Sequence, residues 1–376
     1  MAVLLAISST PSLAEGERPW LVSLFSNVNR WDTSDVDNSG GQTLVYSQIS
    51  YDSDAWGLAL TGTYTDTRYS TTQATDSFEV KTFTDTAISS YYSMKSGRTS
   101  LRGGVDLSLP TGIHSFSSAQ LTRVIADDIS EDLMLVNNYG SGLNVSPHLA
   151  FTYDMSPVTL GLGAKYIFSG AYDPLTDVDN DSFDPGDQLL LLLSANVSIA
   201  NNDFFMLFFS YATFGKDKLG SRDVFQNGDI FALEGKYLRQ WSQVLRTTFG
   251  AVFTTQGKNE STGENNLLKS ETGNSNANKI EVFADSAYDI RDRLTLTGVV
   301  GYKNVAGNGY SMGDDLYDAG RNVVYLEPGV IFFFDEDIYA MAKVRYSRVA
   351  DKKDAFSAQD ANYNVLNLDL GIVVNF

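Results

Sequence analysis

Asn364-Val-Leu-Asn-Leu-Asp-Leu-Gly-Ile-Val-Val-Asn-Phe376 is the last stretch of the chain, and its character alternates residue by residue. One set of alternate positions is entirely apolar: Leu366, Leu368, Leu370, Ile372, Val374 and Phe376. The other set contains Asn367, Asp369, Gly371 and Asn375. A period of two with a fully apolar face is typical of a β-strand that has one face in lipid. The stretch therefore predicts a membrane-spanning strand at the end of the chain.

The end of this strand also carries a resemblance to a known class of proteins. A final strand that stops on an outward aromatic residue, here Phe376, is similar to the carboxy-terminal assembly signal of bacterial outer-membrane β-barrels. The resemblance implies a porin-like barrel in the outer membrane of a Gram-negative bacterium. It also implies two partners, the lipid of that membrane and the barrel assembly machinery.

Composition excludes other classes of protein. The 376 residues are 43% hydrophobic but contain no apolar run of 18 residues, which excludes a helical membrane span. Twenty Tyr and 22 Phe against eight Pro suit a strand-rich protein. The net charge of −19 argues against nucleic acid as a partner, because nucleic-acid binding needs a basic surface. The absence of cysteine fits an oxidising envelope in which a barrel needs no disulfides.

The first fourteen residues have the character of a secretion signal. A short apolar stretch is followed by Ser12-Leu13-Ala14, an acceptable cleavage tripeptide, although the usual basic leader is missing. We expect residues 1–14 to be a signal peptide, truncated or started at the wrong site, and residues 15–376 to be the barrel.

Alternating segments recur along the whole chain. We expect sixteen strands, at 20–31, 41–51, 55–68, 78–94, 98–109, 145–154, 157–169, 187–200, 203–214, 228–241, 243–256, 278–290, 293–304, 322–334, 337–349 and 363–376. Seven short turns interleave with eight long polar links, as periplasmic turns and outer loops do in outer-membrane barrels. The predicted fold is all-β: a single closed antiparallel transmembrane barrel of about sixteen strands, with fourteen as the alternative.

Aromatic residues recur where the two membrane interfaces should lie. Four Tyr residues stand eight positions after the first outward residue of a strand: Tyr64, Tyr166, Tyr302 and Tyr346. Eight residues span about 26 Å, which a tilt of about 40° reduces to about 20 Å of height. We expect these Tyr residues to form the outer girdle, and Trp56, Phe205, Trp241, Tyr288, Phe334 and Phe376 to form the inner one.

The same alternation places charges of both signs inside the barrel. The inward set includes Glu79, Lys81, Asp85, Arg102, Asp106, His148, Lys165, Lys303, Lys343, Arg345 and Asp369. A polar lumen of both signs suits a water-filled channel. The alternative, compatible with the first, is that these groups pair with one another to support the wall.

The link 110–144 is the longest and is the third outer loop, the one that folds into the barrel and narrows it in the general porins. Ser117 or Ser118 could cap a helix that runs through about Leu135. The polar side of that helix would carry Asp127, Asp128, Glu131 and Asp132. If the helix enters the barrel, these acids should face basic residues of the wall and constrict the pore. The alternative is an external lid on the barrel mouth.

The interior also contains apolar positions. Alternation turns Leu190, Leu192, Met206, Phe208 and Phe333 inward, among others. Such residues could form a path for an apolar solute, or pack beneath an inserted loop or plug.

A second resemblance bears on the solute. The run Asp106-Leu-Ser-Leu-Pro-Thr-Gly112, followed by a long loop, is similar to barrels of the phenol-degradation meta-pathway transporter type. Those barrels are distant relatives of the fatty-acid and toluene channels, so the resemblance implies transport of hydrophobic or aromatic compounds. Two features depart from the relatives. A strand begins by Trp20, where the fatty-acid channels have a plug, and the predicted strand number exceeds their fourteen.

Metal binding and catalysis have weak signals. Asp177, Asp179 and Asp181 alternate like the first half of a calcium loop, but Ser182 replaces the required Gly and no Glu closes the loop. A Ca²⁺ site there competes with a solvated acidic loop tip, and we otherwise expect no cofactor. The chain has only two His residues and no nucleophile elbow or phosphate loop, so we expect no enzymatic activity.

These observations predict a channel for the passive uptake of small solutes, narrowed by residues of 110–144. The alternative is a structural or adhesin-type barrel, for example a sleeve around an electron carrier.

Overall fold

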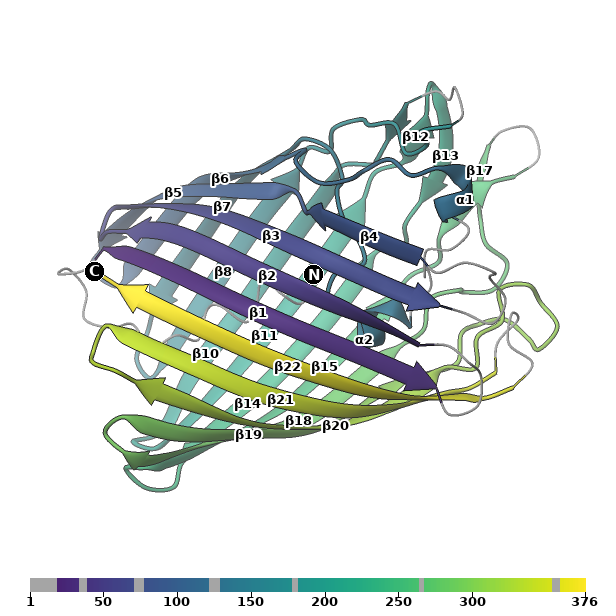
Figure 1. Ribbon diagram of the computed structural model, residues 1–376. Coiled ribbons are helices and arrows are strands. Elements are labelled where there is room, and N and C mark those ends of the chain that lie inside the picture. Colours follow the sequence, from purple (N-terminus) through teal and green to yellow (C-terminus); the bar gives the residue numbers. More distant parts are fainter. Residues whose placement is uncertain are drawn as a thin grey trace.

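The computed structural model describes residues 19–33, 39–70, 78–121, 129–177, 182–263, 267–353 and 359–376. Strands with alternating burial dominate it, as the alternating sequence predicts (Figure 1). The strands of the main sheet are β1 (Trp20–Thr33), β2 (Ser39–Asp52), β3 (Trp56–Ser70), β4 (Phe78–Phe83), β5 (Thr86–Ser96), β6 (Thr99–Leu109), β7 (Asn144–Asp154), β8 (Val158–Ile167), β10 (Gln188–Ala200), β11 (Asp203–Phe214), β14 (Ile230–Gln240), β15 (Leu245–Gln256), β18 (Lys279–Arg291), β19 (Leu294–Val305), β20 (Arg321–Phe333), β21 (Ile338–Asp351) and β22 (Ala361–Asn375). The described helices are α1 (Ser118–Leu121) and α2 (Ser130–Leu133), and none is long and apolar enough to cross a membrane.

The main sheet closes into a barrel of sixteen strand positions. Each strand pairs antiparallel with the next, and β22 closes on β1 from Leu21 opposite Asn375 to Thr33 opposite Tyr363. Trp20 and Phe376 complete the seam by exchanging two backbone hydrogen bonds of 3.0 Å. Closure leaves the wall without a first or last edge, which lipid requires because an unpaired backbone group there costs several kcal/mol. The predicted fold class and strand number are confirmed.

One predicted strand is interrupted. The segment expected at 78–94 divides into β4 and β5, which occupy successive parts of one wall position beside β3. Residues between the two strands shift the alternation by one, so that Phe78 and Val80 turn inward and are buried. The expectation that Glu79 and Lys81 lie inside is therefore wrong, because a shift of one residue exchanges the two faces of a strand.

Glu79 and Lys81 instead belong to a charge ladder on the outer face of the barrel. Glu79 contacts Arg68 at 3.1 Å, and Lys81 approaches Asp66 at 4.0 Å. These four side chains lie near the long-loop end, where the strands leave the apolar band.

The outer surface carries the apolar side chains that alternation predicts. Leu366, Leu370 and Ile372 on β22 are each more than 40% exposed, in contrast to the buried Val365 and Asn367 beside them. Exposed aromatic residues gather near the short-turn end: Trp20, Trp56, Trp241, Phe334 and Phe376. Tyr166, Tyr302 and Tyr346 are exposed toward the long-loop end. Two aromatic belts around an apolar band are the arrangement of a barrel that sits in a bilayer.

A second sheet lies beyond the barrel wall. It is built from three outer loops and has the order β17 (Leu268–Ser270), β16 (Glu260–Thr262), β13 (Arg222–Gln226), β12 (Asp217–Leu219) and β9 (Phe183–Asp184). The pairing ties loops that follow β8, β11 and β15 to one another. It therefore supports the outer rim on that side of the barrel.

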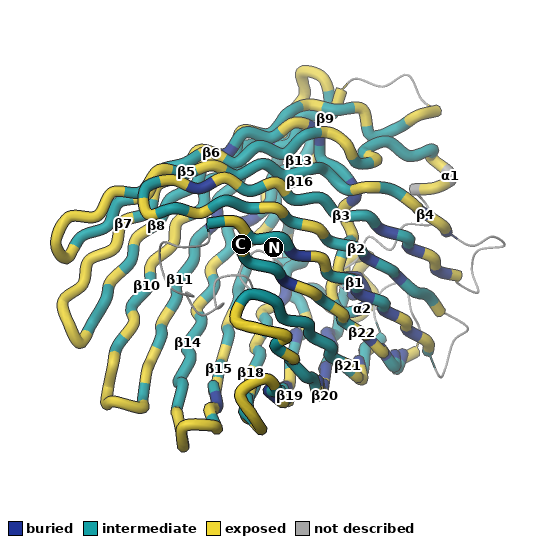
Figure 2. The backbone as a smooth tube through the Cα atoms, turned by 60° about the vertical axis from the view of Figure 1, so that its left-hand side comes forward, coloured by how far each residue is buried: buried dark blue, intermediate teal, exposed yellow. Residues whose placement is uncertain are grey.

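The buried core lies inside the barrel, near the long-loop end. Figure 2 shows buried segments concentrated there on β1, β2, β3 and β20 to β22. Trp31, which is 3% exposed, lies against Gly40, where a Cβ would come within 2.2 Å of the indole ring. The glycine thus makes room for the largest aromatic side chain of this core.

Replacing Phe376 by Ala should lower the yield of folded barrel several-fold without changing the conductance of the barrels that form. The side chain is 56% exposed, and the seam to Trp20 uses backbone atoms that the substitution keeps. The substitution should therefore impair assembly of the barrel and leave the assembled wall unchanged. Heat-modifiable electrophoresis of the outer-membrane fraction measures the yield, with Phe334→Ala, at 49% exposure, as the matched control. Equal yields of folded barrel for the two variants would show that Phe376 has no special role in assembly.

Candidate functional site: the lumen and its inserted segment

Residues 129–139, here called the inserted segment, lie inside the barrel. Gln42 on β2 is 1% exposed, and its side-chain Oε1 accepts hydrogen bonds from the backbone N–H groups of Leu135 and Val136, both at 3.0 Å. Its Nε2 donates to the Val136 carbonyl at 2.6 Å, and Asn29 Nδ2 on β1 donates to the Leu133 carbonyl. A peptide inside the barrel needs such partners, because a buried backbone polar group without a hydrogen bond costs about 1–3 kcal/mol.

Apolar packing reinforces this attachment. Leu133 is 1% exposed and Ile129, Met134 and Tyr139 are also buried, all within one cluster with side chains of the wall. The wall side of the cluster consists of Trp31, Tyr69, Phe78, Val80, Val323, Tyr325, Val349, Ala361, Tyr363 and Val365. These wall residues come from β1, β3, β4 and β20 to β22, so the segment is packed against one continuous arc of the barrel (Figure 1).

Two acids of the segment make ion pairs with three basic residues of the wall. Glu131 lies 2.9 Å from Lys279 and 2.8 Å from Lys303, and Asp132 lies 2.8 Å from Lys303 and 2.5 Å from Arg321. We call these five residues the acidic latch. The side chains of Arg321 and Asp132 are only 2% and 8% exposed, so their charges are largely removed from water.

The acidic latch lowers the pKa of Glu131, the more exposed of its two acids. Burial alone would raise the pKa of Glu131, but the charges of Lys303 and Lys279 and their hydrogen bonds outweigh it and lower the pKa to about 2. Glu131 is therefore ionised at every pH at which the protein is expected to work.

The predicted helix of the loop ends slightly earlier than expected. The structure describes α1 and α2 within its expected range, residues 122–128 lie outside the described residues, and Met134 after α2 is already extended. The side-chain bonds of Gln42 hold the backbone that follows α2, so tertiary contacts end the helix there. Asp127 and Asp128, two of the four acids predicted to constrict the pore, lie outside the described residues.

The predicted lumen charges form two separate groups. On β5 to β8, Asp106 accepts from Lys165 at 2.8 Å and from Ser89 at 2.7 Å, while His148 Nδ1 lies 3.5 Å from the same carboxylate. Arg102 stacks over the ring of Tyr91, 4.0 Å from its centroid.

The second group lies across the barrel, on β20 to β22. Glu327 is 3.4 Å from Lys343 and 2.6 Å from Arg345, and its side chain is 7% exposed. Asp369 follows on the next strand, paired in register with Lys343 and hydrogen-bonded to Asn27. Both groups are close ion-pair networks, as expected for residues that support the wall while lining a polar lumen.

Four of the five predicted apolar lumen residues come together. Leu190 pairs in register with Lys165, and Phe208 pairs with Glu234, which places both inside. Leu190 and Leu192 on β10 continue into Phe208 and Met206 on β11 as a diagonal stripe, here called the apolar stripe. Phe333 is inward too, but it lies at the short-turn end of β20, 5.6 Å from the ring of Tyr339, and is not part of the stripe.

The apolar stripe is accessible from the lumen. Leu192 is 48% exposed although its register turns it inward opposite Gly163. Lys236 on β14 lies 5.9 Å from the centroid of Phe208, so a cation borders the stripe.

The acidic run of the 170–186 loop has a structural role at its described end. Asp177 accepts from the backbone N–H of Ser118 at 2.9 Å and from its hydroxyl at 3.0 Å. Asp179 and Asp181 lie outside the described residues, and no group of three or more metal-ligating side chains occurs in the described ranges. The Ca²⁺ hypothesis therefore stays a prediction.

Sequence reasoning missed most partners of the inserted segment. Arg321 is the first residue of β20, one position before the strand predicted at 322–334, and Lys279 is the first residue of β18, two positions before Glu281 on the same face. Asn29 and Gln42 carried no signal, because inward Asn and Gln are ordinary in a barrel. Asp85, predicted inside, accepts from the backbone N–H groups of Gly112 and Ser141 and so joins the two ends of the loop.

Comparison with known proteins identifies the architecture. No protein-family model matches the chain, and no curated protein matches it. Among solved structures, a bacterial polysaccharide outer membrane secretin has a TM-score of 0.50 at 10% identity, covering 96% of this chain and 100% of that one. A TodX monoaromatic hydrocarbon channel deltaS2 mutant has a TM-score of 0.50 at 11% identity, covering 97% and 91%. The Pseudomonas putida toluene transporter TodX matches at 0.47 and 11%, covering 99% and 93%. Together with the closed wall and its apolar band, the first two likenesses show that the chain has the fold of outer-membrane β-barrels.

Proposed function

We propose that this outer-membrane barrel lets small solutes with apolar or aromatic surface diffuse passively into the periplasm. The passage runs between the inserted segment and the opposite wall, where the apolar stripe lies. One observation carries the proposal: Leu192 of the stripe is 48% exposed inside the lumen and the other three side chains are only partly buried, although burial of apolar surface is favourable by about 25 cal/mol per Å².

The positions of the inserted segment and of the apolar stripe support this solute class. The segment is attached to β1, β2 and β18 to β20, whereas the stripe lies on β10 and β11, on another part of the wall. A solute that passes the segment therefore meets Leu192 and Phe208, with Lys236 beside them. Concave sites lined by apolar groups with a few polar ones are typical for small organic ligands. The fold is similar to that of the TodX monoaromatic hydrocarbon channel, whose name states the same solute class.

The proposal makes the chain a channel and not an enzyme. His148 then serves the wall network around Asp106, so His148→Gln should leave solute passage unchanged. The competing class, a structural or adhesin-type barrel, would conduct nothing: folded protein without conductance in planar bilayers and without swelling of liposomes would overturn the channel.

Replacing Leu192 by Asp should lower the uptake of an uncharged aromatic solute such as benzyl alcohol about tenfold relative to a polar solute such as arabinose. The substitution places a charge on the apolar stripe, and a charged group binds apolar surface poorly because it would have to lose water. Flux into proteoliposomes measures both solutes on one preparation. The matched lumen control is Thr152→Asp, an exposed inward position on β7 that lies outside both the apolar stripe and the acidic latch. Equal losses for the two solutes would show that the stripe does not select.

A further inference from the structure

Asp285 on β18 is an exposed acid of the lumen. It pairs in register with Thr248 on β15 and Val299 on β19, at the alternate positions that face inward. Its side chain is exposed, and it makes no hydrogen bond or ion pair with any residue of the described ranges. The charge of its carboxylate is therefore free to act on a solute in the passage.

The charges near Asp285 are paired with one another. They form three groups in which acids and bases are equal in number: Glu234 with Lys236, Asp289 with Arg246, and Glu327 and Asp369 with Lys343 and Arg345. Glu281, on the same strand as Asp285, pairs in register with Lys303 and accepts a hydrogen bond from the Tyr325 hydroxyl at 2.6 Å. Asp285 therefore adds a negative charge that these groups do not balance.

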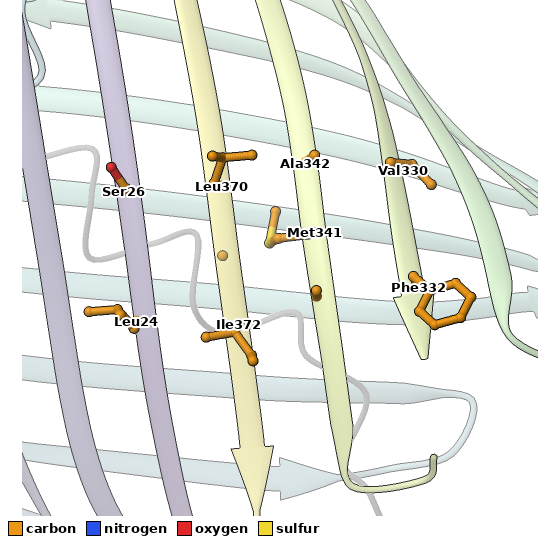
Figure 3. A pocket seen from close by; sticks show the side chains of 10 residues that line it. Leu24, Ser26, Val330, Phe332, Met341, Ala342, Leu370 and Ile372 are labelled. Atoms are coloured by element: carbon orange, nitrogen blue, oxygen red, sulfur yellow. The ribbon is translucent and has the colours of Figure 1, made fainter. Parts of the chain in front are cut away.

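Charges at this height of the wall face the lumen and not the lipid. Figure 3 shows the outward side of β20 to β22 and β1, where a groove of about 460 Å³ is lined by apolar side chains and Ser26, and none of its lining residues is charged. Glu327 and Lys343, on two of the same strands, stand at the alternate inward positions. The charge of Asp285 therefore acts where solutes pass.

Asp285 also lies close to the apolar stripe. Lys236, which borders the stripe at Phe208, is near enough to Asp285 for the two charges to interact. Gly250 separates Lys236 from Phe283 in the register, and a Cβ on Gly250 would come within 2.2 Å of the Phe283 ring. The ring thus lies across Gly250 on the lumen side. It places apolar surface between the carboxylate and the stripe.

An aromatic ring beside a carboxylate is a combination that attracts an organic cation. The ring attracts a cation that comes within about 6 Å of its centroid. Phe283 and Asp285 stand two positions apart on one face of β18, which is about 7 Å along the strand. One ammonium group can therefore contact both side chains, whereas an anion of the same size would be repelled by the carboxylate.

An exposed cation, Arg102, lies on the far wall and nearer the short-turn end. Arg102 is the fourth residue of β6 counted from its short turn, whereas Asp285 is the seventh residue of β18 counted from its own. Arg102 also stacks on Tyr91, 4.0 Å from the ring centroid. A solute that descends past the inserted segment therefore reaches the level of Asp285 before that of Arg102.

We infer that Asp285 makes the passage selective for small organic cations, whose charged group passes between the Asp285 carboxylate and the ring of Phe283. The inference rests on the proposed function, because it names the charge of the solutes that the passage admits. The formal net charge of −19 acts in the same direction, since a negative protein raises the concentration of cations at its surface.

Flux into proteoliposomes tests this selectivity with three solutes that do not cross lipid unaided. Benzyltrimethylammonium and benzenesulfonate share a phenyl ring and carry opposite charges, and arabinose is the neutral reference. Wild-type barrels should pass the cation about fivefold faster than the anion, each relative to arabinose. Asp285→Asn should lower this cation-to-anion ratio about threefold, because it removes the charge and keeps the shape of the side chain. The reversal potential in a KCl gradient should shift toward that of chloride.

Matched variants separate the charge of Asp285 from other effects. Asp292→Asn removes the same charge from the short turn after β18, outside the lumen, and should leave the ratio unchanged. Asp285→Asn/Thr248→Asp returns a carboxylate to the register partner and should recover most of the ratio. Heat-modifiable electrophoresis reports folding, and Asp285→Ser replaces the Asn variant if that variant does not fold.

Two results would overturn the role of Asp285. One is a wild-type ratio in the folded Asp285→Asn barrel, which would assign any preference to the net charge of the protein. The other is a loss that the double variant does not recover, which would show that the substitution acts through the wall and not through charge. Passage of arabinose without preference for the cation would contradict only this inference, whereas barrels that pass neither arabinose nor ions would contradict the proposed function itself.

Discussion

Replacing residues 129–137 by a Gly-Ser linker of the same length should raise the single-channel conductance several-fold. The substitution removes Leu133 and Met134 from the core inside the barrel, and Glu131 and Asp132 from the acidic latch. A flexible linker has neither apolar contacts nor charges to hold it against the wall, so it should leave the lumen. Because conductance follows the open cross-section, clearing the segment should have a larger effect than any single substitution in the lumen. Planar-bilayer recordings at fixed salt measure the change.

The matched control is the same linker in place of residues 309–317, an outer loop of equal length. That loop bonds to other outer loops, for example through Gly309 N–H to the Asn274 carbonyl at 2.7 Å and Tyr310 to Glu271. Its replacement should leave the conductance at the wild-type value. If the 129–137 variant also conducts like the wild type, the inserted segment does not limit the passage.

The wall could be predicted from the sequence because lipid imposes one rule on every strand. The alternation that places Leu366, Leu370 and Ile372 outward at the end of the chain recurs in each strand, and the structure pairs those strands in order. The rule failed once, between β4 and β5, where the alternation shifts. The two faces of a strand are one residue apart, so a shift of one residue puts Glu79 and Lys81 on the outer face, opposite to the prediction.

The partners of the inserted segment could not be predicted by the same rule. Alternation states which face a residue occupies, but it does not state its height in the barrel or which loop it meets. Lys303 was placed inside correctly, whereas its contact with Glu131 and Asp132 depends on how far the 110–144 loop descends. Arg321 was missed because it stands at the first position of a strand, where loop and strand are hardest to distinguish.

Replacing Arg321 by Met should release the inserted segment from part of its wall and raise the conductance. Asp132 would keep Lys303 but lose its 2.5 Å partner while its side chain remains buried. Removing one partner of a buried ion pair costs about 3–5 kcal/mol, because the remaining charge is left without compensation. The double variant Arg321→Met/Asp132→Leu should recover part of the loss, since replacing both partners by apolar groups is often close to neutral. Arg246→Met, which breaks the more exposed pair with Asp289 at 3.2 Å, is the lumen control and should not change the conductance.

The pH dependence of the conductance tests the latch without a substitution. The pKa of Glu131 is lowered from 4.5 to about 2, so its contribution to docking is fully present above pH 4.5 and is lost as the pH falls through about 2. Conductance of the wild type should therefore remain in its narrow state between pH 7 and pH 4 and rise only in stronger acid. In Glu131→Gln this acid-dependent contribution is absent, so that variant should show a larger conductance already at pH 7. Opening of the wild type with a midpoint near pH 4.5 would mean that Glu131 titrates like a free carboxyl group, and that Lys279 and Lys303 do not hold the segment in the lumen.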